Sequence, residues 1–248
     1  MIIHTYEKGG RGRACADYLY EKSREIDLDE IIVLPIPTTR DNKYLKDSEI
    51  PLDDIVKTVR RGVFVIGYSL PKEFSERLTE RGAYVFDAGL DENFLTMNAE
   101  LTALCTLGIL LTTSERVPGD LKFGIVGYGR IGKKLTEELL FLGADVRVYT
   151  SRDNMRLELC EFGVASSMST KNASFSGIDI LINTAPAVIF DASSIPDGLR
   201  VIDLASGNNF PFLESYERYP SIPAKMFPIS SGRALAAAAL SHLSGVKD

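Results

Sequence analysis

The stretch "GIVGYGRIGKKL" at residues 124–135 constrains the fold most strongly, because its glycines have the spacing G-x-G-x-x-G. An apolar run precedes the glycines and an amphipathic helical pattern follows them. In such a unit Gly127 permits a tight turn, Gly129 lets a pyrophosphate approach the backbone, and Gly132 lets the helix pack closely on the strand. The N-terminus of the helix then faces the phosphates. The stretch therefore predicts a dinucleotide-binding turn; the alternative is a turn of the same shape without a ligand.

The next predicted strand, "DVRVYT", ends without the acidic residue expected at this place. An Asp or Glu there binds the ribose hydroxyls of NAD, whereas an arginine suits the 2′-phosphate of NADP. The chain has Thr150, Ser151 and Arg152 instead, and their hydroxyls and guanidinium would hydrogen-bond a phosphate. We therefore expect NADP(H), with NAD(H) as the less favoured cofactor. Ser151 and Asp153 could instead cap the following helix, and capping is compatible with phosphate binding.

Strand-like and helix-like patterns alternate along the whole chain. Strands are predicted at 1–6, 30–37, 62–69, 83–89, 121–128, 145–150, 179–185, 200–206 and 225–230, and helices at 11–26, 52–61, 71–82, 96–114, 131–143, 153–163 and 232–245. Continuous apolar strands that alternate with helices indicate parallel sheets covered on both faces. The predicted class is α/β with two domains: a C-terminal Rossmann dinucleotide-binding domain and a smaller, flavodoxin-like parallel α/β N-terminal domain.

The Pro/Gly turn "ERVPGD" at residues 115–120 separates the two series of strands and helices. It predicts an N-terminal substrate domain at 1–114 and an NADP-binding Rossmann domain at 115–231. The apolar, small-residue helix within 232–248 is expected to pack back on the first domain.

Composition and charge exclude several classes of protein. The chain of 248 residues has a net charge of −6, which argues against a nucleic-acid-binding surface. Its three cysteines and two histidines lack the spacing of a disulfide framework or a zinc site, so no metal is predicted. The apolar stretch 101–111 is shorter than the roughly 20 residues of a membrane span and predicts a buried helix. No secretory signal pattern is present at the start, so we expect a cytoplasmic protein without membrane contact.

Candidate substrate-binding residues follow the predicted strands, because ligands of open α/β sheets bind beyond the carboxyl ends of the strands. Thr38, Thr39 and Arg40 in "PIPTTRD" are the best candidates, since three side-chain donors together suit a carboxylate. Glu100 in the long helix could orient a substrate or simply favour the helix dipole. Other polar residues could bind ligand or cap turns and helices; these are Asp87, Asp91, Asn93, Asn183, Thr184, Asp203, Ser206, Asn208 and Arg233.

Histidine is nearly absent. His4 lies in the first predicted strand and His242 in the last predicted helix, and neither is placed as a general base. Oxidation of an alcohol by a histidine-dependent dehydrogenase is therefore disfavoured. A hydride transfer that needs no strong base, such as oxidation of a ring or imine carbon, fits better.

Several motifs in order resemble those of a known family, the A subunit of dipicolinate synthase. They are "IIVLPIPTTRD", "LTMNAELTALCTLGILL", "GIVGYGRIGKKL", "GADVRVYTSR", "IDILINTAPAVIF" and "VIDLAS", and the likeness covers residue 30 onward. The resemblance implies a cytoplasmic oxidoreductase of spore-forming bacteria, in which NADP-linked oxidation of a dihydropyridine dicarboxylate gives dipicolinate. It also implies that the partner is a flavoprotein-like B subunit. The chain differs from the family pattern in a shorter N-terminal domain and in the segment before the last helix.

Together these features predict an NAD(P)-dependent oxidoreductase in which Thr38, Thr39 and Arg40 anchor a small carboxylate substrate and Glu100 orients it. The predicted cofactor-binding residues are Gly127, Tyr128, Gly129, Arg130, Ile131, Gly132, Thr150, Ser151, Arg152, Asn183, Thr184, Ala185 and Pro186. One alternative is an accessory or regulatory subunit that binds NADP(H) without catalysis. Another is an enzyme of the shikimate or methylene-tetrahydrofolate dehydrogenase kind, with Lys43 as the catalytic residue. A homo-oligomer is left open.

Overall fold

A computed structural model describes residues 1–25, 28–168, 173–187, 190–205, 209–210, 213 and 216–247. The chain divides into two compact units, which are described separately. Unit 1 contains Met1–Leu101 together with Pro223–Asp248, and unit 2 contains Thr102–Ile222.

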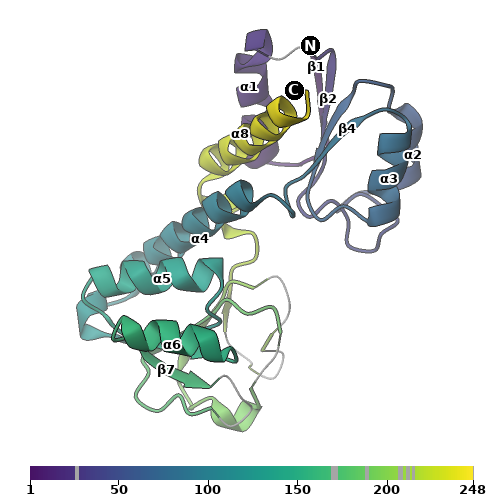
Figure 1. Ribbon diagram of the computed structural model, residues 1–248. Helices are drawn as coiled ribbons and strands as arrows, with labels where there is room; N and C mark the ends of the chain where they lie inside the picture. Colours follow the sequence, from purple (N-terminus) through teal and green to yellow (C-terminus); the bar gives the residue numbers. More distant parts are fainter. Residues whose placement is uncertain are drawn as a thin grey trace. The chain divides into compact units, whose positions relative to one another are not determined.

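Unit 1 is built on a four-stranded parallel sheet with the strand order β1-β2-β3-β4. Its elements are β1 (Ile2–Thr5), α1 (Gly10–Glu21), β2 (Glu30–Val33), α2 (Leu52–Thr58), β3 (Phe64–Gly67), α3 (Lys72–Glu80), β4 (Tyr84–Asp87), the first part of α4 (Glu92–Thr113), and α8 (Pro228–Lys247). Helices α1 and α8 pack side by side on one face of the sheet (Figure 1). Helices α2 and α3 cover the other face.

The connection from β1 to β2 has the opposite hand to the other two connections in this sheet. Each connection moves one strand in the same direction, but α1 lies on one face whereas α2 and α3 lie on the other. Parallel crossovers are right-handed in about 98% of cases, so we infer that the connection from β1 to β2 is the left-handed one. In a flavodoxin-like sheet the first strand lies between the second and third. Here β1 lies at the edge and pairs with β2.

Unit 2 has a six-stranded sheet with the order β10-β9-β8-β5-β6-β7, and every pairing is parallel. Its elements are β5 (Lys122–Val126), α5 (Arg130–Phe141), β6 (Asp145–Thr150), α6 (Asp153–Glu161), β7 (Ala165–Met168), β8 (Ile180–Asn183), β9 (Arg200–Asp203), β10 (Glu217–Arg218) and the start of α7 (Ile222–Met226). Numbered within the unit, this is the Rossmann order 3-2-1-4-5-6. The predicted α/β class with a C-terminal Rossmann fold is confirmed.

Some predicted elements differ from the observed ones. The strand predicted at 225–230 is wrong, because these residues form the end of α7 and the start of α8. Pro228 is the first residue of α8, a position that proline tolerates well since no intrahelical partner is needed for its nitrogen. Helix α8 therefore begins at Pro228 instead of 232. Strands β7 and β10 were not predicted.

Helix α4 is longer than its apolar stretch suggested. It begins at Glu92, where the Asp91 carboxylate accepts a hydrogen bond of 2.7 Å from the backbone N–H of Phe94. Among the helices that the structure describes, α4 alone is long and apolar enough to cross a membrane, with a mean hydropathy of 1.6 over an 18-residue window. Half of that window is buried inside the protein, and Leu107 and Leu110 belong to the same hydrophobic core cluster as Phe123. A core helix has the same properties.

Candidate dinucleotide site

The glycine turn after β5 has the geometry that its spacing predicts. Gly127 has φ of 90°, a region that non-glycine side chains rarely adopt. A Cβ at Gly132 would collide with the carbonyl oxygen of Gly127, so helix and turn are in close contact. At Gly129, by contrast, an added Cβ would meet no atom within 4 Å. The space beside Gly129 is therefore open to a ligand.

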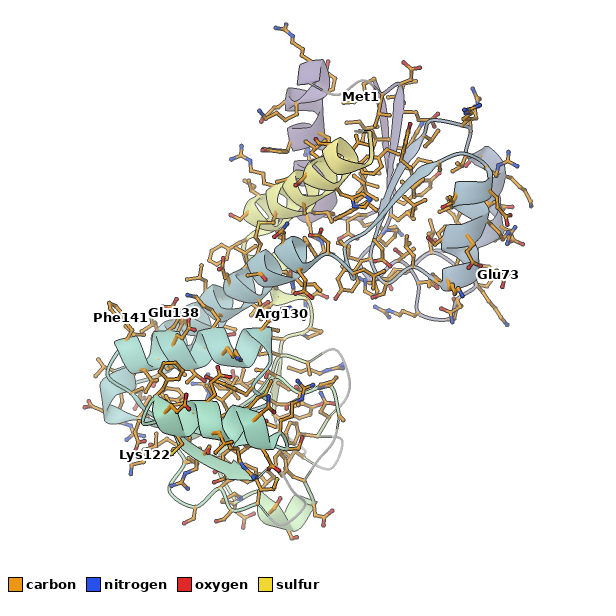
Figure 2. The ribbon with its side chains drawn as sticks, in the orientation of Figure 1. Met1, Glu73, Lys122, Arg130, Glu138 and Phe141 are labelled. Atoms are coloured by element: carbon orange, nitrogen blue, oxygen red, sulfur yellow. The ribbon has the colours of Figure 1, made fainter. Side chains whose placement is uncertain are left out.

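Helix α5 begins directly after this turn. Its N-cap is Gly129, which supplies no side-chain cap to the first backbone N–H groups. Figure 2 labels Arg130 at this end of α5 and Glu138 and Phe141 at the other. Uncapped N–H groups and the positive end of the helix dipole together favour an anion such as a pyrophosphate.

A cavity of about 310 Å³ lies at this edge of the sheet. It is bounded by the segments that follow β5, β6 and β8, which are adjacent strands in the sheet. The strand order reverses between β5 and β8, which is where open α/β sheets bind their ligands. The lining residues are Gly127, Tyr128, Gly129, Tyr149, Thr150, Ser151, Arg152, Met155, Thr184, Ala185, Pro186 and Ala187.

Most of the predicted cofactor-binding residues therefore line one cavity. Arg130, Ile131, Gly132 and Asn183 do not line it. Three lining residues were not predicted: Tyr149, Met155 and Ala187. Met155 lies in the first turn of α6, so the closeness of that helix to the end of β6 could have identified it.

The end of β6 presents hydroxyls and a guanidinium but no acid to this cavity. Thr150 is buried and its hydroxyl accepts a hydrogen bond of 3.3 Å from the backbone N–H of Arg152. Ser151 and Arg152 are exposed. Arg152 occupies the N-cap of α6 and makes no side-chain cap, and Asp153 pairs with Arg156 instead. None of the described residues that line the cavity carries a carboxylate.

A buried amide–carboxylate network holds the neighbouring loop. Asn183 donates to the Asp203 carboxylate at 2.8 Å and to the carbonyl oxygen of Ala185 at 3.0 Å. Asn209 also donates to Asp203, at 3.3 Å, and the three polar side chains are almost completely buried. Asn183 and Asp203 thus shape the loop that contains Thr184 and Ala185 from within the core. Ser206 and Asn208 lie outside the described residues.

In unit 1, the loop after β2 contains Thr38, Thr39 and Arg40. The Thr38 hydroxyl is buried and accepts a hydrogen bond of 3.0 Å from the backbone N–H of Tyr68. The Thr39 hydroxyl accepts one of 3.0 Å from the N–H of Asn42. Arg40 is exposed and lies 3.4 Å from the Asp47 carboxylate. The Thr38 hydroxyl therefore joins this loop to the loop after β3, and the Thr39 hydroxyl stabilises its own loop. Arg40 is the exposed member of this group.

The remaining candidates are mostly caps or exposed side chains. Asp87 accepts hydrogen bonds of 2.7 Å and 2.9 Å from the backbone N–H groups of Ser69 and Leu70. The exposed residues are Asn93, Glu100, Arg233 and Lys43, of which Lys43 lines a separate cavity of about 570 Å³ in unit 1. Within the described ranges, no group of acidic, histidine or cysteine side chains could hold a metal ion.

Two buried charged residues of unit 1 were not predicted. Glu7, in the turn between β1 and α1, forms an ion pair with Arg11 in the first turn of α1, and both contact the backbone of Ile36. The segment "EKGGRG" that contains them has glycines at positions 9 and 12, spaced like the last two glycines of the cofactor turn. That spacing could have identified the turn, but nothing in the sequence indicated that the two charges would be buried.

Comparison with known proteins finds matches among solved structures. No protein-family model and no curated protein sequence matches the chain. Among solved structures, the A subunit of dipicolinate synthase from Bacillus halodurans matches with a TM-score of 0.79 at 20% identity, covering 98% of this chain and 97% of that one. The corresponding chain of dipicolinate synthase from Bacillus subtilis also gives 0.79, at 18% identity, covering 99% and 96%.

More distant matches are other oxidoreductases. Transhydrogenase from Sinorhizobium meliloti has a TM-score of 0.61 at 16% identity, covering 97% of this chain and 91% of that one. Structures of L-alanine dehydrogenase and D-lactate dehydrogenase match with TM-scores of 0.56. At these identities the likeness concerns the fold: the chain has the two-part α/β architecture of the dipicolinate synthase A subunits and of Rossmann-type dehydrogenases.

Proposed function

We propose that the protein is an NADP(H)-dependent oxidoreductase that transfers a hydride between the nicotinamide and a small carboxylate, with dihydrodipicolinate as the leading candidate. The observation that carries the proposal is the 310 Å³ cavity at the strand-order reversal. It combines the glycine turn of β5 with Thr150, Ser151 and Arg152 at the end of β6. The fold shared with the dipicolinate synthase structures supports the choice of reaction.

The preference for NADP follows from charge. A 2′-phosphate carries negative charge, so a carboxylate at the end of β6 would repel it and a guanidinium would bind it. Arg152 stands at that place, exposed beside the cavity. NAD would forgo this contact and would also find no carboxylate for its ribose hydroxyls among the described lining residues.

Each part of the protein has a defined role in the proposed mechanism. The glycine turn and the N-terminus of α5 bind the pyrophosphate, and Arg152 binds the 2′-phosphate. The Asn183–Asp203 hydrogen bond keeps the loop that contains Thr184 and Ala185 in place. Arg40 anchors the substrate carboxylate on a loop that Thr38 and Thr39 hold, and Glu100 orients the substrate. The bound nicotinamide supplies the hydride acceptor or donor.

Two measurements test the proposal. Thermal denaturation should show a larger stabilisation by NADP(H) than by NAD(H), because a ligand that binds the folded state alone raises its stability. Equal shifts, or none, would contradict the cofactor assignment. Turnover is then tested by following the absorbance of the reduced nicotinamide. The starting compound is freshly prepared 4-hydroxy-tetrahydrodipicolinate, from which the dihydropyridine dicarboxylate derives. Stabilisation by NADP(H) without turnover would favour the alternative of a non-catalytic accessory protein.

Partner and location belong to the same proposal. Adding a flavoprotein-like B subunit should raise turnover if the protein is half of a two-component enzyme. Co-purification of the two chains and fractionation of cells would check the partner and the cytoplasmic location. Homo-oligomerisation can be read from light scattering of the isolated protein.

A further inference from the structure

Three charged side chains converge on the peptide of Ile36, which lies just before the loop of Thr38–Arg40. The Glu7 carboxylate accepts a hydrogen bond of 2.9 Å from the Ile36 N–H. The Ile36 carbonyl oxygen accepts one of 3.3 Å from Arg11 Nη2 and one of 2.6 Å from Lys46 Nζ. We call Glu7, Arg11 and Lys46 the Ile36 clamp.

The Glu7–Arg11 pair is buried: Glu7 is 8% exposed and Arg11 is 4% exposed. Arg11 Nε donates to Glu7 Oε1 at 2.8 Å, and Nη2 contacts the same oxygen. Burying two charges costs solvation free energy, so an ion pair of this kind is weak evidence for stability alone. Its location suggests another use, because both partners also bind the backbone that leads into the candidate substrate loop.

The turn that supplies this pair is built like the cofactor turn of unit 2. A Cβ at Gly12 would collide with the carbonyl oxygen of Glu7, just as one at Gly132 would collide with that of Gly127. Glu7 therefore occupies the position that the first glycine has in the cofactor turn. Its carboxylate binds the exit of β2, so this turn holds a loop.

Two further cations lie beside this loop. Lys8 Nζ donates to the Asp47 carbonyl oxygen at 2.9 Å, and Arg40 pairs with the Asp47 carboxylate. The charged residues linked to the Ile36 clamp and to Asp47 are Lys8, Arg11, Arg40, Lys46, Glu7 and Asp47. The Asp41 carboxylate, also in this loop, accepts a hydrogen bond from the Thr39 hydroxyl.

Lys46 has no carboxylate in direct contact. Glu7 is paired with Arg11 and Asp47 with Arg40, whereas the hydrogen bond of Lys46 goes to a neutral carbonyl oxygen. Among the described residues, no carboxylate lies within 4.0 Å of its ammonium group. Lys46 is partly buried, and this burial lowers its pKa. The carboxylates of Glu7 and Asp47 favour its charged form from a distance, but burial has the larger effect on its pKa. A partly buried ammonium group with no carboxylate in direct contact favours binding of an anion.

We propose that Lys46 binds an anionic group of the substrate and that the buried Glu7–Arg11 pair positions it. This inference rests on the proposed function, because it assumes that the loop of Thr38–Arg40 faces the substrate. The backbone supports the link, since the N–H of Lys46 donates to the carbonyl oxygen of Thr38 at 2.9 Å. A displacement of the Ile36 peptide would therefore move Lys46 and Thr38 together.

The first experiment measures binding, independently of turnover. Wild type, Lys46→Gln, Lys46→Arg and the control Lys57→Gln are titrated calorimetrically with pyridine-2,6-dicarboxylate and with NADP(H). Lys57 is an exposed lysine paired with Asp54. Lys46→Gln should weaken dicarboxylate binding about tenfold or more, since a charge-assisted hydrogen bond is lost. Lys46→Arg and Lys57→Gln should retain most of the affinity, and NADP(H) binding should be unchanged throughout.

Equal dicarboxylate affinity in wild type and Lys46→Gln would overturn the proposal, and so would undetectable binding to wild type. Failure of the proposed cofactor assignment gives a different result, because wild type then does not bind NADP(H). Failure of catalysis alone shows as NADP(H) binding without turnover.

A double-mutant cycle tests the positioning role of the pair. If Glu7 acts through Lys46, Glu7→Gln should weaken dicarboxylate binding in the wild-type background but not in the Lys46→Gln background. Its effect on unfolding should be the same in both backgrounds, which separates positioning from a purely structural role. Additive effects on dicarboxylate affinity would show that Glu7 does not act through Lys46.

Discussion

At the scale of single residues, our proposal of NADP over NAD depends on the end of β6. Arg152 stands beside the cavity in the place of the acid that would bind an unphosphorylated ribose. We predict that Arg152→Ala weakens NADP(H) binding about tenfold or more, because a charge-assisted hydrogen bond to the 2′-phosphate is lost. NAD(H) binding should change little. Dissociation constants from nicotinamide fluorescence would measure both.

Arg60→Ala is the matched control, since Arg60 is an exposed arginine of unit 1. It should leave both affinities unchanged. An equal loss of NADP(H) and NAD(H) affinity in Arg152→Ala would mean that this residue does not distinguish the two cofactors.

Asp203 illustrates a buried residue whose effect on the site is indirect. Asp203→Ala would remove the carboxylate to which the side-chain amides of Asn183 and Asn209 donate inside the core, and one N–H group of each would lose its acceptor. We predict a loss of about 3 kcal/mol in the free energy of unfolding, since unsatisfied buried polar groups cost about 1–3 kcal/mol each. Urea denaturation would measure it. The exposed Asp197→Ala is the control, and a comparable loss there would contradict the argument.

At the scale of the elements, two glycines of the same turn should respond differently to substitution. An added methyl group at Gly129 meets no protein atom within 4 Å, whereas one at Gly132 collides with the Gly127 carbonyl oxygen. We predict that Gly129→Ala keeps the stability of wild type but loses NADP(H) affinity, because the methyl group occupies the space of the pyrophosphate. Gly132→Ala should lose both.

Thermal melts and cofactor titration of the two variants would separate the effects. Normal NADP(H) affinity in a stable Gly129→Ala protein would show that the pyrophosphate does not lie against this turn.

The carboxylate of Asp179, which lies just before β8 and binds the start of β5, should make stability depend on pH. The backbone N–H of Lys122 and the side chain of Arg116 both donate to Asp179 and lower its pKa. A pKa lowered in the folded state stabilises the protein above the unfolded value of about 3.9, and the contribution disappears as pH falls through the folded value. We predict that Asp179→Asn is less stable than wild type at pH 7. The difference in urea midpoints should shrink below about pH 4, and a constant difference would contradict this.

The sequence was sufficient to predict those elements whose pattern is strong and local. The Rossmann unit follows from the glycine turn and its flanking apolar strand. Strand β7, with the sequence Ala-Ser-Ser-Met, has no apolar alternation and could not be recognised. The order of the strands in unit 1 was also beyond reach, because edge position depends on pairing between distant segments.

The candidate site was predictable to the same extent. Backbone roles such as those of Gly127 and Gly132 follow from spacing. The sequence could not show that Thr38 and Thr39 use their hydroxyls to bind backbone N–H groups, or that Glu7 and Arg11 are buried. These outcomes depend on which neighbouring backbone groups lack partners after folding.

At the scale of the whole molecule, the three cysteines report on the two cores separately. Burial raises the pKa of Cys15 to about 12 and that of Cys105 to about 11, whereas Cys160 is exposed. Because the thiolate is the reactive form, a disulfide reagent at neutral pH should label Cys160 first. Cys15 lies in the core of unit 1 and Cys105 in that of unit 2.

We therefore predict that NADP(H) slows the labelling of Cys105 more than that of Cys15, because the cofactor stabilises the unit that binds it. Mass spectrometry of peptides from partly labelled protein would give both rates. Equal protection of the two cysteines would indicate that the units open together.

The packing of α8 on α1 has a consequence for how the protein is made. A Cβ at Gly10 would lie 2.7 Å from that of Pro228, so residues more than two hundred positions apart are in close contact. Residues 102–222 form one continuous stretch that can fold as soon as it leaves the ribosome, whereas unit 1 must wait for 223–248. Until α8 has been synthesised, the side of α1 that contacts α8 stays uncovered, and chaperones can bind there. A chain that ends before residue 223 should therefore lose the folded structure of residues 1–101 to a greater extent than that of residues 102–222.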